Sequence, residues 1–188
     1  MKNVFKKIGI AIMTLLVFTF SSCEELEDLL KFNFDLEGEA IYFDVEAISE
    51  TGELTELGRQ TYDRSLADIL AEESPNADIN KIKEINLTSI TLEIVEGADD
   101  NNNFQNISSI KAEIEADGLD GKTVAELSSI PDVYATKLVV PVTNGKVNVK
   151  DYFNKTNFSY AVKGVFREPT TKTLKLKVTA NYSFVFGL

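Results

Sequence analysis

An alternation of apolar and polar residues near the end of the chain is the feature that most limits its fold. From Leu174 to Phe186 every second residue is apolar, and Lys175 and Lys177 occupy positions between them. Successive side chains of a strand point to opposite faces, so this period of two predicts a strand with one buried and one solvated face. Residues 158–166 alternate in the same way, and a turn around Pro169 separates the two segments.

Shorter alternating segments are spread through the rest of the chain. They cover residues 31–36, 39–45, 85–96, 108–117, 137–142 and 146–149. In residues 85–96 the apolar phase changes between Leu87 and Ile90. Such a change predicts a β-bulge near Thr88 and Ser89.

Two hairpins and one helix complete the expected elements. Asn144-Gly145 lies between apolar runs, which is the strongest hairpin signal in the chain. Residues 53–62 are expected to return along 39–45 as a second hairpin. A short helix is expected to begin at Ser65, because Asp68 three residues later resembles the acidic partner in a capping box.

These elements predict a mainly β fold. Roughly eight to ten short strands with turns between them favour an antiparallel β-sandwich with one short helix, and a β-barrel is the alternative. The chain has 188 residues, of which 44% are hydrophobic and 26% charged. We expect one domain over residues 32–188, which is long enough to bury a core without disulfides.

The first 22 residues have a different composition. Lys2, Lys6 and Lys7 give a positive start, and residues 8–20 follow without a charge. This apolar run is too short for a transmembrane helix, which needs about 20 residues. Its length and the small residues after it predict a secretory signal peptide over residues 1–22.

The end of this segment resembles the signal of a known protein class. Phe20-Ser21-Ser22-Cys23 is similar to the lipobox of bacterial lipoproteins, in which the cysteine sulfur receives a diacylglycerol and becomes the mature N-terminus. Phe20 and Ser22 depart from the usual leucine and the usual glycine or alanine. Cys23 is the only cysteine of the chain, so the resemblance implies lipid attachment there and membrane anchoring.

Residues 23–31 are expected to form an acidic tether. Glu24, Glu25, Glu27 and Asp28 follow Cys23 directly. They resemble the acidic stretch after the lipidated cysteine of lipoproteins that some Gram-negative gut anaerobes export to the cell surface. The alternative is a solvated spacer. The resemblance implies an outer-membrane location, at the cell surface or on the periplasmic side.

The composition of the chain excludes several kinds of partner and catalytic site. Without the three lysines of the signal, 16 Lys and Arg face 30 Asp and Glu, a net charge of −14, so we expect no nucleic-acid partner. The chain has no histidine, and Cys23 is assigned to lipid. The common histidine and cysteine metal sites and catalytic triads therefore cannot form, and we expect neither a cofactor nor an enzyme.

One internal loop is rich in polar side chains. Asp99, Asn101 and Asn103 are spaced like the start of an EF-hand, but Phe104 replaces the required glycine and Ile110 the required glutamate. The EF-hand interpretation fails. The candidate ligand-binding residues are Asp99, Asp100, Asn101, Asn103 and Phe104, for a calcium or glycan contact. A simple connecting turn is the alternative.

The sequence thus predicts a lipid-anchored, non-enzymatic binding or assembly module at the cell envelope, with a glycan, protein or fibre partner. One alternative is a pilin-like subunit of a surface fibre, in which the C-terminal strand is the candidate donor strand. Another is a carrier of an apolar ligand, which would need a cavity between the sheets.

Overall fold

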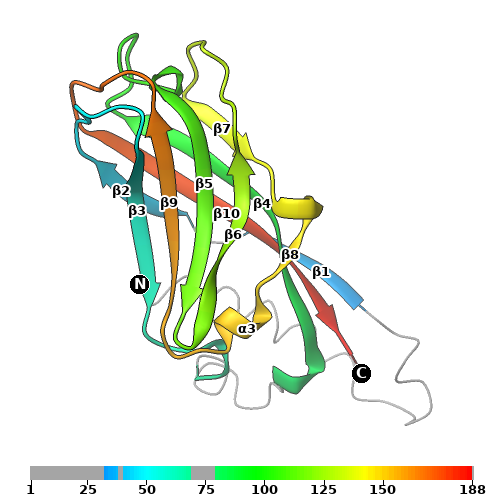
Figure 1. Ribbon diagram of the computed structural model, residues 1–188. Coiled ribbons are helices and arrows are strands. Elements are labelled where there is room, and N and C mark those ends of the chain that lie inside the picture. Colours follow the sequence, from blue (N-terminus) through cyan, green and yellow to red (C-terminus); the bar gives the residue numbers. More distant parts are fainter. Residues whose placement is uncertain (1–31, 38–39, 69–78, 188) are drawn as a thin grey trace.

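The chain forms two antiparallel β-sheets that pack face to face in a computed structural model (Figure 1), which describes residues 32–37, 40–68 and 79–187. Its strands are β1 (Phe32–Glu37), β2 (Ile41–Val45), β3 (Leu54–Tyr62), β4 (Ile82–Glu96), β5 (Ile107–Ala116), β6 (Leu119–Leu127), β7 (Lys137–Val140), β8 (Val147–Asn148), β9 (Phe158–Phe166) and β10 (Leu174–Phe186). The short helices are η2 (Ile79–Lys81), η3 (Phe104–Asn106), η4 (Thr143–Gly145) and α3 (Lys150–Phe153). The predicted β-sandwich is confirmed, and the sheets do not close into a barrel.

The C-terminal strand lies in the middle of its sheet. In sheet A, β10 pairs with β1 and β2 on one side and with β4 on the other, and β4 pairs in turn with β7 and β8. Each edge of sheet A therefore consists of two short strands placed one after the other. Sheet B has the order β3-β9-β5-β6.

The alternation predicted for β10 is confirmed. Leu174, Leu176, Val178, Tyr182, Phe184 and Phe186 are buried, while Lys175 and Lys177 lie on the other, partly exposed face. The bulge is also confirmed. Asn181 pairs with Ser89 and Tyr182 with Leu87, so Thr88 is the extra residue, and its hydroxyl donates to the Asn181 carbonyl at 3.1 Å. The bulge keeps both Leu87 and Ile90 on the core side of β4.

Both predicted hairpins are wrong. Asn144 and Gly145 have φ values of 55° and 79°, as Asn-Gly turns require, but β7 and β8 do not pair with each other and instead both pair with β4. Pro141 cannot donate to the ladder, and Val142 forms a bridge to Ala125 of β6 in the other sheet. The Asn144-Gly145 turn therefore interrupts one edge of sheet A, and the chain pairs with β4 both before and after it.

The second hairpin fails because β2 and β3 belong to different sheets. β2 pairs with β10 and β3 pairs with β9. The loop between them crosses from one layer of the sandwich to the other. In the sequence, a turn between two strands looks the same whether the chain returns in one sheet or crosses to the other.

The capping box at Ser65 is confirmed. The Asp68 amide donates to the Ser65 hydroxyl at 3.1 Å, and the Ser65 amide donates to the Asp68 carboxylate at 3.1 Å. Residues 66–68 are helical, and Leu66 packs in the core. The rest of the predicted helix lies outside the described residues. The short helix α3 had no sequence prediction.

Side chains from both sheets form one hydrophobic core. Its lower part is aromatic. Phe153 of α3 lies 5.0 Å from Phe158 and 5.7 Å from Tyr182 between ring centroids, and Tyr62 stacks on Phe158 at 4.7 Å. These contacts join α3 to strands of both sheets, so the helix covers this end of the core.

Two tyrosines with buried hydroxyl groups predict a loss of stability in alkali. Burial raises the pKa of Tyr182 to about 12 and the pKa of Tyr160 well above its ordinary value of 10. Because the folded state holds these protons more tightly than the unfolded state, the stabilisation is complete below pH 10 and is lost as the pH rises towards 12. Wild type should unfold in that range, together with the appearance of tyrosinate absorbance.

The control for this prediction is Tyr160→Phe. The Tyr160 and Tyr182 hydroxyls interact with each other, so removal of the Tyr160 hydroxyl should lower the stability at pH 7 by no more than about 1.5 kcal/mol. It should also move the alkaline midpoint, measured by circular dichroism, to higher pH. An unchanged midpoint would show that Tyr160 does not contribute to the transition.

Candidate functional site

Four loops meet at the upper end of the sandwich in Figure 1. We call residues 46–53, 97–106, 128–136 and 167–173 the upper loop cluster. Backbone hydrogen bonds join these loops to one another and to adjacent strand ends. Among them, the Thr170 amide donates to the Ile48 carbonyl at 2.9 Å, and the Phe104 amide donates to the Ala135 carbonyl at 2.9 Å. The cluster therefore forms one connected structure.

Three asparagines of the cluster are buried and serve the fold. The Asn102 carboxamide oxygen accepts from the Thr171 amide at 2.7 Å. The Asn103 oxygen accepts from the amides of Gln105 and Ala135 at 2.8 and 3.3 Å. The Asn106 side chain donates to the Pro169 carbonyl and accepts from the Asn103 amide, both at 3.0 Å. Their amide groups replace the backbone partners that irregular loops lack.

These positions change the predicted ligand site. Phe104 and Asn103 are each only 1% exposed, so neither can touch a ligand at the surface, and their assignment to a surface site is corrected. The asparagine-rich run is an anchor for three loops. Asp100 and Asn101 are exposed and Asp99 is half-buried, and these three stay candidates for a ligand contact.

Asp99 already has partners in the structure. Hydrogen bonds from Lys172, from the Asn102 side chain and from the Asn101 amide lower its pKa from 3.8 to about 2, with Lys172 the largest cause. The stabilisation is present above pH 3.8 and is lost as the pH falls towards 2. Among the described residues, no three His, Cys, Asp or Glu side chains lie together in a group that could hold a metal.

The cluster also exposes two large apolar side chains. Val133 is 60% exposed and Tyr134 is 54% exposed, and both belong to the loop between β6 and β7. Their neighbour Asp132 lies 4.0 Å from the Arg167 guanidinium. Arg167 also donates to the carbonyls of Ile107 and Ile130, so the base of this loop is held firmly.

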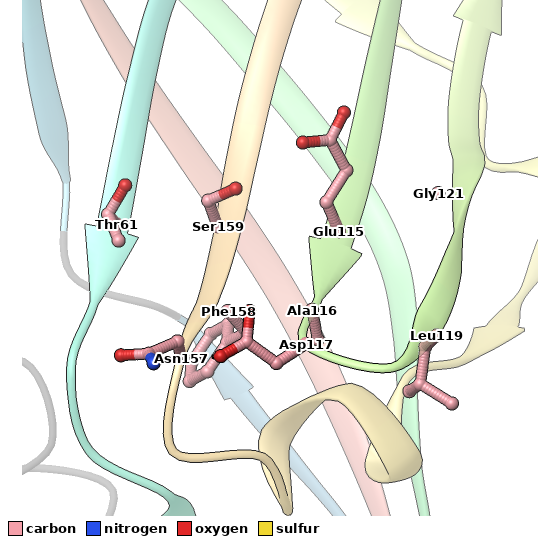
Figure 2. A pocket seen from close by; sticks show the side chains of 9 residues that line it. All are labelled: Thr61, Glu115, Ala116, Asp117, Leu119, Gly121, Asn157, Phe158 and Ser159. Atoms are coloured by element: carbon pink, nitrogen blue, oxygen red, sulfur yellow. Dashed lines mark hydrogen bonds between the residues drawn. The ribbon is translucent and has the colours of Figure 1, made fainter.

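A second candidate site lies on the outer face of sheet B, at the end opposite the upper loop cluster. It is an open hollow of about 410 Å³ lined by Thr61, Glu115, Ala116, Asp117, Leu119, Gly121, Asn157, Phe158 and Ser159 (Figure 2). The residues come from all four strands of the sheet, from the turn between β5 and β6 and from the segment between α3 and β9. We call it the sheet B hollow.

Ion pairs fix the rim of the sheet B hollow. The Arg59 guanidinium donates to Glu115 at 2.7 Å, to Ser159 at 3.0 Å and to Glu56 at 2.9 Å. The hydrogen bonds that Arg59 donates to Glu56, the largest cause, and to Glu115 raise the pKa of Arg59 above its ordinary value, so this group stays cationic. Asn157 donates to the Asp117 carboxylate at 2.9 Å.

A second ion-pair group continues across the same face. Glu113 accepts from Lys163 at 2.6 Å and lies 2.5 Å from the Lys111 ammonium. These contacts, with Lys111 the largest cause, lower the pKa of Glu113. These ion pairs hold the charged side chains in place on the outer face of sheet B, beside the hollow.

Sequence reasoning did not find the sheet B hollow. Thr61, Glu115 and Ser159 read as ordinary solvent-facing residues of three separate strands. Their proximity depends on the order β3-β9-β5, which pairs Thr61 with Ser159 and Ser159 with Glu115. No motif in the sequence encodes that order.

The residues predicted to anchor and export the protein are not part of this geometry. Cys23, Glu24, Glu25, Glu27 and Asp28 lie outside the described residues. In the described parts of the chain, no helix combines the length and the apolar character needed to cross a bilayer.

Comparisons with known proteins give no family. No protein-family model matches the sequence, and no curated protein matches it. One similar solved structure is that of infectious bursal disease virus, Gx strain, with 9% identity and a TM-score of 0.35; the match covers 84% of this chain and 33% of that one. The chain therefore spans about a third of the length of that protein.

Two further structures have a comparable likeness. The decameric BFDV capsid protein is 13% identical with a TM-score of 0.31, and the match covers 82% of this chain and 99% of that one. Desmodium yellow mottle tymovirus is 12% identical with a TM-score of 0.22, over 80% of this chain and 82% of the other. These values are too low to support an inference about function.

Proposed function

We propose that the chain is an outer-membrane lipoprotein whose β-sandwich is a non-enzymatic binding or assembly module. The observation that carries the proposal is the placement of the only cysteine, Cys23, between an uncharged run of signal-peptide length and an acidic stretch. A lipid on Cys23 would attach the sandwich to the membrane. Residues 1–22 would be removed as the signal peptide.

The start of the sandwich gives this anchor a definite direction. β1 begins nine residues after Cys23, and nine residues reach at most about 30 Å. Phe32 pairs with Phe186, at the end of β10 opposite the upper loop cluster. In the anchored protein, the end of the sandwich where β1 begins would therefore lie near the membrane. The upper loop cluster would face away from the membrane.

The upper loop cluster has features of a protein contact surface. Val133 and Tyr134 are exposed on a loop whose base Arg167 holds, and aromatic side chains on a firm support are enriched at interfaces. Asp99, Asp100 and Asn101 of the same cluster would supply polar contacts. These features favour binding or assembly as the role of the module.

The two alternative roles receive less support. A carrier of an apolar ligand needs space between the sheets, whereas the buried side chains of both sheets are in contact in one core. A pilin-like subunit with the C-terminal strand as donor needs that strand free, whereas β10 is paired on both sides within its own sheet. The donor assignment is therefore corrected.

The acidic tether provides the test of surface location. Protease added to intact cells should digest the wild-type protein. Replacement of the four acids Glu24, Glu25, Glu27 and Asp28 by alanine should protect the protein from digestion. The variant would still be lipidated, but it would stay on the periplasmic side of the outer membrane. The total amount in the membrane fraction should not change.

A charge-preserving variant is the control for this experiment. Glu25→Asp with Glu27→Asp keeps every negative charge of the tether, so the protein should stay accessible to protease. Equal digestion of the wild type and the four-alanine variant would assign the tether to a solvated spacer. Protection of the wild type itself would place the module on the periplasmic side.

A further inference from the structure

We infer that the sheet B hollow is a binding site for a neutral saccharide, one or two hexose units in size. This inference deepens the proposed binding function and rests on it, but it concerns a different surface from the upper loop cluster. The hollow lies on the outer face of sheet B, where β3 and β5 end and β6 and β9 begin. Its volume of about 410 Å³ lies within the range of roughly 300–1,000 Å³ that small-molecule sites occupy.

The lining offers both donors and acceptors of hydrogen bonds. Figure 2 shows the side chains of Thr61, Ser159, Glu115, Asp117 and Asn157 around the hollow. Ser159 accepts from Arg59, so its own hydroxyl hydrogen can donate to a ligand. Hydroxyl groups of a sugar both donate and accept, so they match this mixture.

The two carboxylates are held by internal partners and keep spare acceptor capacity. One oxygen of Glu115 accepts from Arg59, and one oxygen of Asp117 accepts from Asn157. A carboxylate has about four lone-pair sites, so each can still accept from a sugar hydroxyl. The partners also fix the orientation of both groups before a ligand arrives, which lowers the entropic cost of binding.

The lining selects against two other ligand classes. An anion would meet the carboxylates of Glu115 and Asp117, whereas the Arg59 guanidinium already has Glu56 and Glu115 as partners. An apolar ligand would desolvate five polar side chains without replacing their hydrogen bonds, because only Leu119, Ala116 and the largely buried Phe158 are apolar in the lining. A neutral ligand with several hydroxyl groups avoids both costs.

A glycine keeps the hollow open. A Cβ atom at Gly121 would lie 3.2 Å from Cγ of Glu115, so a side chain there would displace the Glu115 side chain and occupy the hollow. The φ angle of Gly121 is not positive, so the backbone does not require glycine at this position. Gly121→Val therefore blocks the site, and valine suits a strand.

The test is saturation-transfer difference NMR on the full chain in mild detergent. The probes are glucose, galactose, mannose and N-acetylglucosamine at up to about 10 mM, because a small open site is expected to bind in the millimolar range. Transfer to N-acetylglucosamine alone would indicate an N-acetylated glycan as the source, and transfer to the plain hexoses a neutral polysaccharide. Inorganic phosphate, followed by its own NMR signal, tests the anionic class.

Variants locate the site. Gly121→Val should weaken sugar binding at least about tenfold, and Thr61→Val, which removes one hydroxyl at nearly constant volume, should weaken it roughly threefold to tenfold. Thr179→Val on sheet A is the matched control and should bind as wild type does. Circular dichroism checks that each variant is folded, and Thr61→Val decides the matter if Gly121→Val does not fold.

Three results would overturn the inference. They are no transfer to any sugar, equal transfer in wild type and the two hollow variants, or binding of phosphate in place of sugar. None of them bears on the anchor, because membrane attachment is measured separately. A lipid-anchored protein without sugar binding would leave the proposed function standing and remove this site from it.

Discussion

Replacing Phe104 with alanine should lower the free energy of unfolding by about 3–5 kcal/mol. Phe104 is 1% exposed and is part of the hydrophobic core, so truncation removes a buried ring and leaves a cavity in the core. Domains of this size have a net stability of about 5–15 kcal/mol. The variant should therefore be near the limit of folding, and urea denaturation followed by circular dichroism measures the loss.

Tyr134→Ala is the matched control for this prediction. Tyr134 is also an aromatic residue of the upper loop cluster, but it is 54% exposed. Its truncation should change the unfolding free energy by less than about 0.5 kcal/mol. Similar losses for the two variants would mean that Phe104 is not the core anchor of this loop.

The contrast between Phe104 and Tyr134 illustrates what the sequence could not show. An asparagine-rich run is typical of a surface loop, and the sequence alone therefore favours Asn101 and Asn103 as surface residues that contact a ligand. The same carboxamides can satisfy buried backbone groups when another loop covers them. Whether these carboxamides face solvent or bind buried backbone groups depends on residues 130–136 and 167–171, which lie far away in the sequence.

Local patterns predicted the strands well. The alternation along β10, the bulge at Thr88 and the capping box at Ser65 all depend on residues that are close in sequence, and all three are confirmed. The period of two reports which face is buried, and it does not report which strand is the neighbour. The sandwich was therefore predictable as a class.

Strand order was the part that could not be predicted. The predicted hairpin at Asn144-Gly145 is wrong because β7 and β8 both pair with β4, a strand of 15 residues that is long enough for both. The sheet B hollow was missed for the same reason, since it depends on β3, β9, β5 and β6 lying side by side. Turn chemistry alone does not decide between such partners.

The lipid anchor predicts the largest change from a single substitution. Cys23→Ser removes the only cysteine sulfur that can accept a diacylglycerol. In the lipoproteins whose lipobox this segment resembles, the lipid is attached to that sulfur, so a serine in its place would not receive it. The sandwich begins at Phe32, nine residues later, so the domain should fold as before. The variant should lose its stable membrane attachment, because a lipid chain contributes about 0.8 kcal/mol per buried methylene.

Membrane fractionation of wild type and Cys23→Ser tests this central claim most directly. Wild type should be found in the outer-membrane fraction and enter the detergent phase on phase separation. Cys23→Ser should be soluble or retain residues 1–22 as unprocessed precursor, with the circular dichroism of a β-sandwich in either case. A Cys23→Ser protein that is processed and membrane-bound like wild type would contradict the lipoprotein account.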